Sequence, residues 1–291
     1  MIFIILAILC SSLNVLLFKF FEKIEVDSFQ AIVFNYFTCV LAGYLTIESG
    51  FQFDSQTMFS WLPYALVIGT TFIGSFYLIA LTTLRNGVSV AAIANKLSMV
   101  IPIIVAFLLY KEPATWNKVI GILLAIIAVF ASSIKTTKGT DNEPLKKGYL
   151  WLPLTVFLLG GTIDALIGFL EKRVLQPGDE SPFLIFTFGV AAIIGLFLLA
   201  SYIFNKKGKI TPKNVIAGFL LGFPNYGSIY FFLKAISHSQ MDQSALFPII
   251  NIGVVTFSTI AAYLLFSEKL STLNIIGICI ALFAIVLMSW Q

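Results

Sequence analysis

The sequence predicts an all-α polytopic membrane protein with ten transmembrane helices, arranged as two inverted repeats of five helices. Two observations carry this prediction: an apolar composition and an internal duplication. Of the 291 residues, 59% are hydrophobic and 11% are charged, and the mean hydropathy is +0.97. Soluble domains carry about 25% charged residues. A chain this poor in charge belongs to the membrane class.

Ten apolar runs are long enough to cross a bilayer. A hydrocarbon core about 30 Å thick needs about 20 mostly apolar residues per helix, because backbone polar groups cannot stay unpaired in lipid. Inside three spans, at Pro102, Pro224 and Pro248, we expect kinks, since proline removes a helical hydrogen bond. The predicted spans are 2–21, 29–47, 61–82, 87–110, 115–134, 149–170, 183–204, 212–235, 243–266 and 272–290.

The duplication is visible around one glutamate. Glu112 lies in AFLLYKEPATWNKVIGILLAI, and 156 residues later AYLLFSEKLSTLNIIGICIAL places Glu268 at the matching position. At the same offset Asn95 falls on Asn251 without a gap. A duplicated hydrophobic unit is typical of transporters. Because each copy has an odd number of spans, the second copy enters the membrane upside down.

Loop composition predicts the domain division and the orientation. Residues 135–148 read as a linker between a first repeat, 1–134, and a second, 149–291. Loops after odd-numbered spans carry twelve Lys or Arg residues, and loops after even-numbered spans carry four. Basic loops stay in the cytoplasm. The count therefore predicts that 135–148 and 205–213 are cytoplasmic and that both termini lie outside.

Few charged residues lie within the spans. Lys96 is close to the middle of the fourth span, and Asp164 is the only carboxylate well inside any span. Charges at that depth are costly, so they usually face a cavity or a partner. Lys96 could pair with Asp164 as a structural lock, bind an anionic group of a substrate, or reach the lipid interface. Lys234 ends the eighth span and is expected to extend toward the interface.

Polar residues on the fourth and ninth spans are the sharpest candidates for substrate binding. Asn95 and Asn251 are related by the repeat, so inversion would place them at similar depths near the repeat interface. Ser98 accompanies Asn95, and Ser244 lies on the stripe of Asn251. The alternative is interhelical hydrogen bonding with no role in binding. Further candidates are Asn14 in the first span, Tyr77 in the third, and Asn225, Tyr226 and Tyr230 beside Pro224.

Other features are interpreted as structural. Gly218 and Gly222 form a GxxxG face that should pack helices. Glu112 and Glu268 lie at helix ends, where we expect turn or cap roles instead of ion coupling. His238, the only histidine, falls in a loop and should be solvated. With no CxxC pair and no cluster of acids and histidines, we expect no metal and no cofactor.

The segment from Phe72 to Ser133 resembles the signature half of EamA-type carriers of the drug/metabolite transporter superfamily. FYLIAL, SVAAIA, LLYKEP and Pro102 carry the resemblance, which recurs at Ile229–Ser289. It implies ten helices and secondary transport of small metabolites, amino acids, drugs or nucleotide sugars. It also implies cytoplasmic termini, opposite to the charge count. Related four-helix carriers use a glutamate in their first helix for proton exchange. Here no carboxylate precedes Glu22, which disfavours proton-coupled export of lipophilic cations.

The function predicted is a secondary transporter in the inner or plasma membrane, moving small metabolites, carboxylate-bearing ones included, by export or exchange. An alternative is a flippase or subunit for lipid-linked headgroups. A lipid-modifying membrane enzyme is disfavoured because its convergent acids and histidines are missing. The ATP-binding pattern GxxxxGK[ST] is absent from the sequence. Expected partners are a small molecule and the lipid bilayer, not nucleic acid, and the oligomeric state is open between monomer and homodimer.

Overall fold

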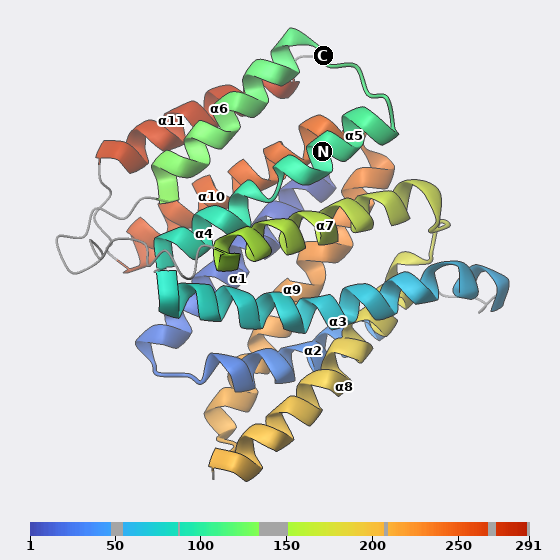
Figure 1. Ribbon diagram of the computed structural model, residues 1–291, viewed down its shortest axis with the longest axis vertical. Coiled ribbons are helices and arrows are strands. Elements are labelled where there is room, and N and C mark those ends of the chain that lie inside the picture. Colours follow the sequence, from blue (N-terminus) through green and yellow to red (C-terminus); the bar gives the residue numbers. More distant parts are fainter. Residues whose placement is uncertain (48–54, 87, 134–150, 207–208, 267–271, 290–291) are drawn as a thin grey trace. The chain divides into compact units, whose positions relative to one another are not determined.

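The computed structural model describes residues 1–47, 55–86, 88–133, 151–206, 209–266 and 272–289, and every element in these ranges is a helix (Figure 1). The helices are α1 (Ile2–Lys23), α2 (Ser28–Leu45), α3 (Ser55–Asn86), α4 (Val88–Leu97), α5 (Val100–Leu109), α6 (Trp116–Ser133), α7 (Trp151–Arg173), α8 (Glu180–Lys206), α9 (Pro212–His238), α10 (Gln243–Phe266) and α11 (Thr272–Ser289). Because α4 and α5 are two parts of the fourth span, these helices give the ten predicted spans. The predicted linker, 135–148, lies outside the described residues.

The apolar character of the helices confirms the membrane class. Within the described chain, eight helices are long and apolar enough to cross a bilayer, counting α4 and α5 together as Val90–Leu109. Shorter apolar helices occupy Trp116–Val129 and Ile275–Met288, inside α6 and α11. The protein is therefore an all-α, multi-pass membrane protein.

The helices pack into two compact units that do not follow the sequence halves. The first unit comprises Met1–Ile73 and Phe169–His238, and the second comprises Gly74–Gly168 and Ser239–Gln291. Each unit thus takes helices from both halves of the chain, and α3 and α7 contribute to both. The predicted repeats, 1–134 and 149–291, are therefore not the units of packing, which joins elements of one half to elements of the other.

In the first unit, α9 packs closely against α2 through two glycines. A Cβ built on Gly218 would lie 2.6 Å from the carbonyl oxygen of Ala31, and one on Gly222 would lie 2.7 Å from that of Asn35. Only glycine allows this approach of two backbones. The packing role expected of the GxxxG face is confirmed. Buried aromatic residues fill the space beside α8, where Trp61 meets Phe183 edge to face at 6.1 Å.

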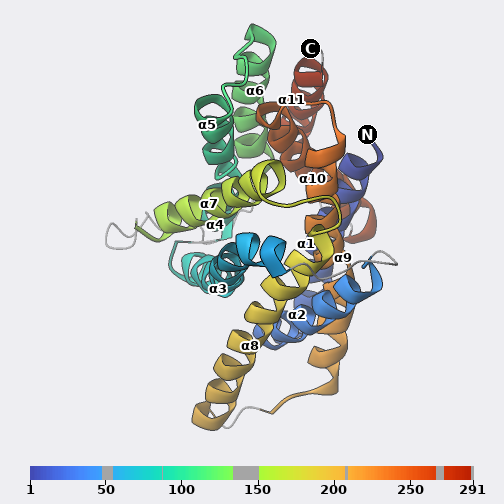
Figure 2. The same cartoon turned by 90° about the vertical axis from the view of Figure 1, so that its right-hand side faces the viewer.

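In the second unit, α6 and α11 run side by side, as both views show (Figures 1 and 2). Gly121 of α6 faces Met288 and Ala284 of α11, and a Cβ on Gly121 would lie 3.5 Å from the carbonyl oxygen of Ala284. The helix α10 packs against α5, α6 and α11. This unit holds the broken fourth span and most of the polar residues that the sequence singles out.

Candidate functional site

The fourth span is broken between α4 and α5, where the sequence predicts a kink. Pro102 has no N–H, so the carbonyl of Ser98 cannot receive the usual bond from four residues ahead. Instead it accepts from the amide of Ile101 at 3.0 Å. The hydroxyl of Ser98 donates to the carbonyl of Asn95 at 2.6 Å. The kink expected from Pro102 is confirmed. The irregular backbone lies at Ser98 and Met99, which precede the proline.

Two glycines bring α7 directly onto this break. A Cβ on Gly161 would lie 2.6 Å from the carbonyl oxygen of Ser98, and one on Gly160 would lie 3.1 Å from its hydroxyl oxygen. The amide oxygen of Asn95 lies 3.4 Å from the same Cβ position on Gly160. The break and Asn95 therefore face the backbone of α7, one helical turn before Asp164.

Lys96 follows Asn95 on α4, and Asp164 lies one helical turn after Gly160 of α7, which the Asn95 side chain faces. The side chains of Lys96 and Asp164 are both half-buried. Among the described residues, no hydrogen bond or ion pair joins them directly. A structural lock through direct contact is thus not formed in this structure, and the electrostatic pairing of the two residues stays a prediction. Lys96, the irregular backbone at Ser98 and Asp164 thus lie where two otherwise apolar spans, the fourth span and α7, pack on each other.

The two candidates on α10, Asn251 and Ser244, differ in the hydrogen bonds of their side chains. The amide group of Asn251 donates to the carbonyl of Phe247, one turn earlier, at 3.2 Å. Ser244 is fully buried, and its hydroxyl oxygen has no hydrogen-bond partner. Tyr77, also in the second unit, is 64% exposed and makes no described contact with these residues.

Glu112 proves to be a cap, as expected, but for a helix far away in the sequence. Its two carboxylate oxygens accept from the amides of Gln243 and Ser244, the first residues of α10, at 3.0 and 2.9 Å. Beside it, Lys118 is 2% exposed and pairs with Asp242, just before α10. The sequence gave no signal for this burial. Glu268, the repeat counterpart of Glu112, lies outside the described residues.

In the first unit, the candidates Asn225 and Asn14 differ in their contacts. The side-chain amide of Asn225 donates to the side-chain oxygen of Asn35 at 3.1 Å and to Cys39 at 3.7 Å. Asn14 is half-buried in α1, with an enclosed side-chain oxygen that has no hydrogen-bond partner. Asn225 thus has a clear structural contact, which sequence periodicity could not reveal.

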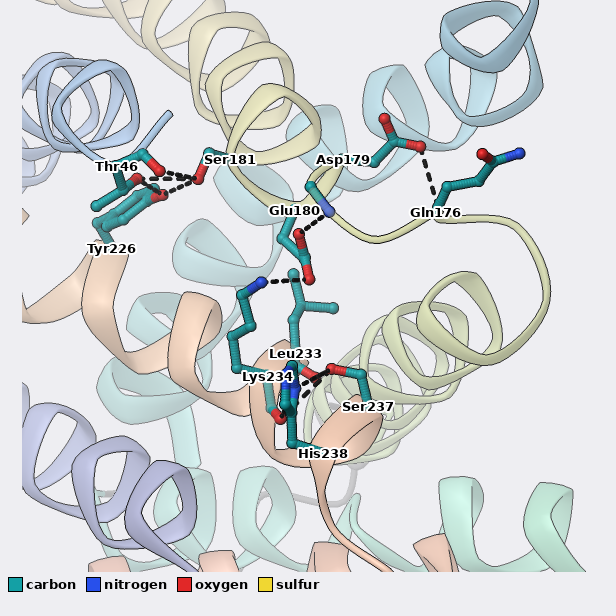
Figure 3. A network of polar contacts seen from close by, with 11 residues as sticks. Thr46, Gln176, Asp179, Glu180, Ser181, Tyr226, Leu233, Lys234, Ser237 and His238 are labelled. Carbon is teal, nitrogen blue, oxygen red and sulfur yellow. Dashed lines mark hydrogen bonds and ion pairs between the residues drawn. The ribbon is translucent and has the colours of Figure 1, made fainter. Parts of the chain in front are cut away.

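Figure 3 shows a second set of polar contacts in the first unit, at the start of α8. The hydroxyls of Thr46, Ser181 and Tyr226 bond to one another, with 2.9 Å from Thr46 to Ser181 and 3.2 Å from Tyr226 to Ser181. Tyr226 is 3% exposed and stacks on Tyr230 with ring centroids 5.5 Å apart. These contacts join the end of α2 and the start of α8 to the middle of α9.

Lys234 forms an ion pair that the sequence did not predict. Its ammonium pairs with Glu180 at 2.8 Å, and the two side chains are 11% and 4% exposed. The ammonium also lies 5.8 Å from the ring centre of Tyr230. His238, by contrast, is exposed, as expected, and contacts Ser237 at 2.9 Å. The partner of Lys234 is 54 residues away in the sequence, which is why a local reading missed it.

Comparison with known proteins decides the identity. The EamA-like transporter family matches residues 1–134 and 147–290, which together cover nearly the whole chain. The chain belongs to the EamA-like transporter family. EamA-like proteins are part of the drug/metabolite transporter superfamily and carry small solutes across membranes; they are not enzymes. The predicted resemblance is confirmed.

Individual relatives agree with this EamA-like assignment. A Haemophilus influenzae protein described as uncharacterized is 33% identical over 288 residues, covering 97% of this chain and 95% of the relative. A crystal structure titled only as that of a protein superposes with a TM-score of 0.71 at 13% identity, covering 98% of both chains. At that identity the likeness shows the fold alone.

Proposed function

We propose that this protein is a secondary carrier of the inner or plasma membrane that moves small carboxylate-bearing solutes by alternating access, in export or exchange. The observation that carries the proposal is the position of Lys96 and Asp164 at the break between α4 and α5. Lys96 follows Asn95, whose amide oxygen faces Gly160 of α7, and Asp164 lies one helical turn after Gly160. Irregular backbone at membrane depth is tolerated where it is covered by protein or lines a cavity. Discontinuous helices of this kind are common at transport sites.

Lys96 would supply the recognition. Its ammonium makes no described direct bond to Asp164, so it would be available to a solute carboxylate. A hydrogen bond between charged groups contributes about 1.5–3 kcal/mol, which corresponds to roughly ten- to a hundredfold in affinity. In this proposal Asp164 balances the ammonium while the site is empty. Asn95, half-buried on the same helix as Lys96, would add a neutral polar contact.

Energy would come from solute gradients. The sequence holds no GxxxxGK[ST] motif, and its first helix has no carboxylate before Glu22 to serve proton exchange. Exchange of one solute for another needs neither an ATP-binding motif nor a proton-exchanging carboxylate. The proposal therefore predicts counterflow: labelled solute should accumulate transiently in vesicles that are loaded with the same unlabelled solute.

The test is uptake into proteoliposomes from a panel of labelled amino acids, monocarboxylates, dicarboxylates and uncharged sugars. Wild type should transport at least one carboxylate and show counterflow. Lys96→Met should remove that uptake while leaving the protein folded, and Lys23→Met, at an exposed lysine, should leave it unchanged. Equal uptake by Lys96→Met and wild type would refute the role of the ammonium. Uptake of sugars alone would refute the solute class.

A further inference from the structure

The start of α10 is capped by a carboxylate from another element. Glu112, in the turn between α5 and α6, is 8% exposed, and both of its oxygens accept backbone amides of α10. A carboxylate at this depth is favourable only if its oxygens are bonded. Here Gln243 and Ser244 satisfy both, 131 and 132 residues further along the chain.

A local residue could have served as this cap. Asp242 occupies the position before α10, where an aspartate commonly accepts the first free amides of its own helix. Its carbonyl accepts from Ala245 and Leu246, but its carboxylate turns to Lys118 instead. The chain thus uses a distant carboxylate where a neighbouring one is available. A local cap stabilises only its helix, whereas a distant cap also fixes where that helix lies.

Two further contacts act at the same helix start. Lys118 links Asp242 to the α5–α6 turn, where it also donates to the carbonyl of Pro113 at 3.2 Å. The side chain of Gln243 donates to the carbonyl of Gly168 in α7 at 3.1 Å. These bonds therefore connect the first turn of α10 to the α5–α6 turn, which follows the broken span, and to α7, which packs on the break.

We infer that Glu112 is a positioning residue for solute binding, which holds α10, and with it Asn251, in register with the broken span that carries Lys96. The inference rests on the proposed function, because it assumes a solute at the break. Glu112 itself touches no solute. It acts through α10, which packs directly on α5.

The test variant is Glu112→Gln, which keeps the size of the side chain but turns an amide N–H₂ toward one of the two backbone donors. The matched control is Asp27→Ala. Asp27 accepts from the amides of Phe29 and Gln30 at 3.0 and 3.2 Å, so it also bonds two amides at a helix start, but within its own helix α2. Both variants should lower thermal stability. Only Glu112→Gln should alter the position of α10.

Position is measured without any solute, by the distance distribution between spin labels at 92 in α4 and 257 in α10. Ala92 and Phe257 are both exposed. The background lacks Cys10 and Cys279 and keeps Cys39, which is fully buried. Glu112→Gln should broaden or shift the distribution, whereas Asp27→Ala should not. If Glu112→Gln does not fold, Gln243→Pro replaces it, since proline is favoured at the first helical position yet removes one donor to Glu112.

The second readout is uptake of the labelled carboxylate that wild type transports best in the panel. Glu112→Gln should raise KM on the order of tenfold, since misplaced contacts weaken binding, while Asp27→Ala leaves KM at the wild-type value. An unchanged label distance overturns the inference whatever the uptake shows. A changed distance with unchanged KM overturns the role in binding. If wild type transports no carboxylate, the proposed function fails, and the label distances alone decide whether Glu112 positions α10.

Discussion

The carbonyl oxygen of Ser98 lies so close to Gly161 that no residue larger than glycine fits at position 161. A Cβ on Gly161 would be 2.6 Å from that oxygen and 2.5 Å from the side chain of Ile101. The oxygen belongs to the backbone at the break of the fourth span, which is held in place by the bond from the amide of Ile101. Gly161 of α7 and the break between α4 and α5 are therefore in close contact.

Gly161→Ala should consequently be destabilising. The added methyl group meets backbone, which cannot move aside as a side chain end would, and overpacking of this kind costs about 1–3 kcal/mol. Gly74→Ala is the control, because a Cβ at Gly74 meets nothing within 4 Å. Unfolding in detergent should show a loss for Gly161→Ala and none for Gly74→Ala. Equal stability of the two variants would contradict the close packing.

The two partners in the Lys118–Asp242 pair should respond unequally to mutation. The side chain of Lys118 is 3% exposed, and that of Asp242 is 31% exposed. Asp242→Asn leaves a buried ammonium without its counter-charge, which costs about 3–5 kcal/mol. Lys118→Met leaves a carboxylate that water can reach, so the loss should be smaller. Denaturation of both single variants and the double variant checks this order. A larger loss for Lys118→Met would show that burial of the ammonium is not the dominant cost.

Tyr226 should matter for stability and not for solute affinity. The sequence alone made it a binding candidate, but its hydroxyl bonds to Thr46 and Ser181 in the structure. Tyr226→Phe should lower the free energy of unfolding by about 1 kcal/mol, a typical net value for a lost hydrogen bond. Tyr44→Phe, at a tyrosine that is 63% exposed, should change nothing. A raised KM for Tyr226→Phe would contradict this prediction and support a role of Tyr226 in solute binding.

Orientation stays a prediction from loop charge. The twelve-to-four bias predicts that the segment around Thr140 is cytoplasmic, whereas EamA-type topology places it outside with cytoplasmic termini. A cysteine at position 140 decides between them in intact cells. Protection from a membrane-impermeant maleimide agrees with the charge bias, and modification agrees with the family topology.

The sequence predicts local features of this protein well and tertiary contacts poorly. The ten spans follow from run length, the kink of the fourth span from a missing N–H at Pro102, and the packing role of α9 from two glycines four residues apart, although not the identity of its partner α2. The pairing of Glu180 with Lys234 and the cap from Glu112 to Ser244 join residues 54 and 132 positions apart. No periodicity encodes such contacts, because they depend on which helices become neighbours.

The sequence also does not predict the division into two compact units. The duplication from Asn95 to Asn251 marks copies of one ancestral unit, and such copies need not be the parts that pack together. Here α10, from the second half, packs on α5 and α6, from the first. Among the candidate residues, no described bond joins Lys96 to Asp164, and Tyr77 makes no described contact with either.

The central claim is that Lys96 recognises a solute carboxylate. The most direct measurement compares uptake of that carboxylate with uptake of its uncharged amide, in wild type and in Lys96→Met. Wild type should prefer the acid by roughly ten- to a hundredfold, the value of one hydrogen bond between charged groups, and Lys96→Met should lose the preference. A preference for the acid that survives in Lys96→Met would contradict the claim.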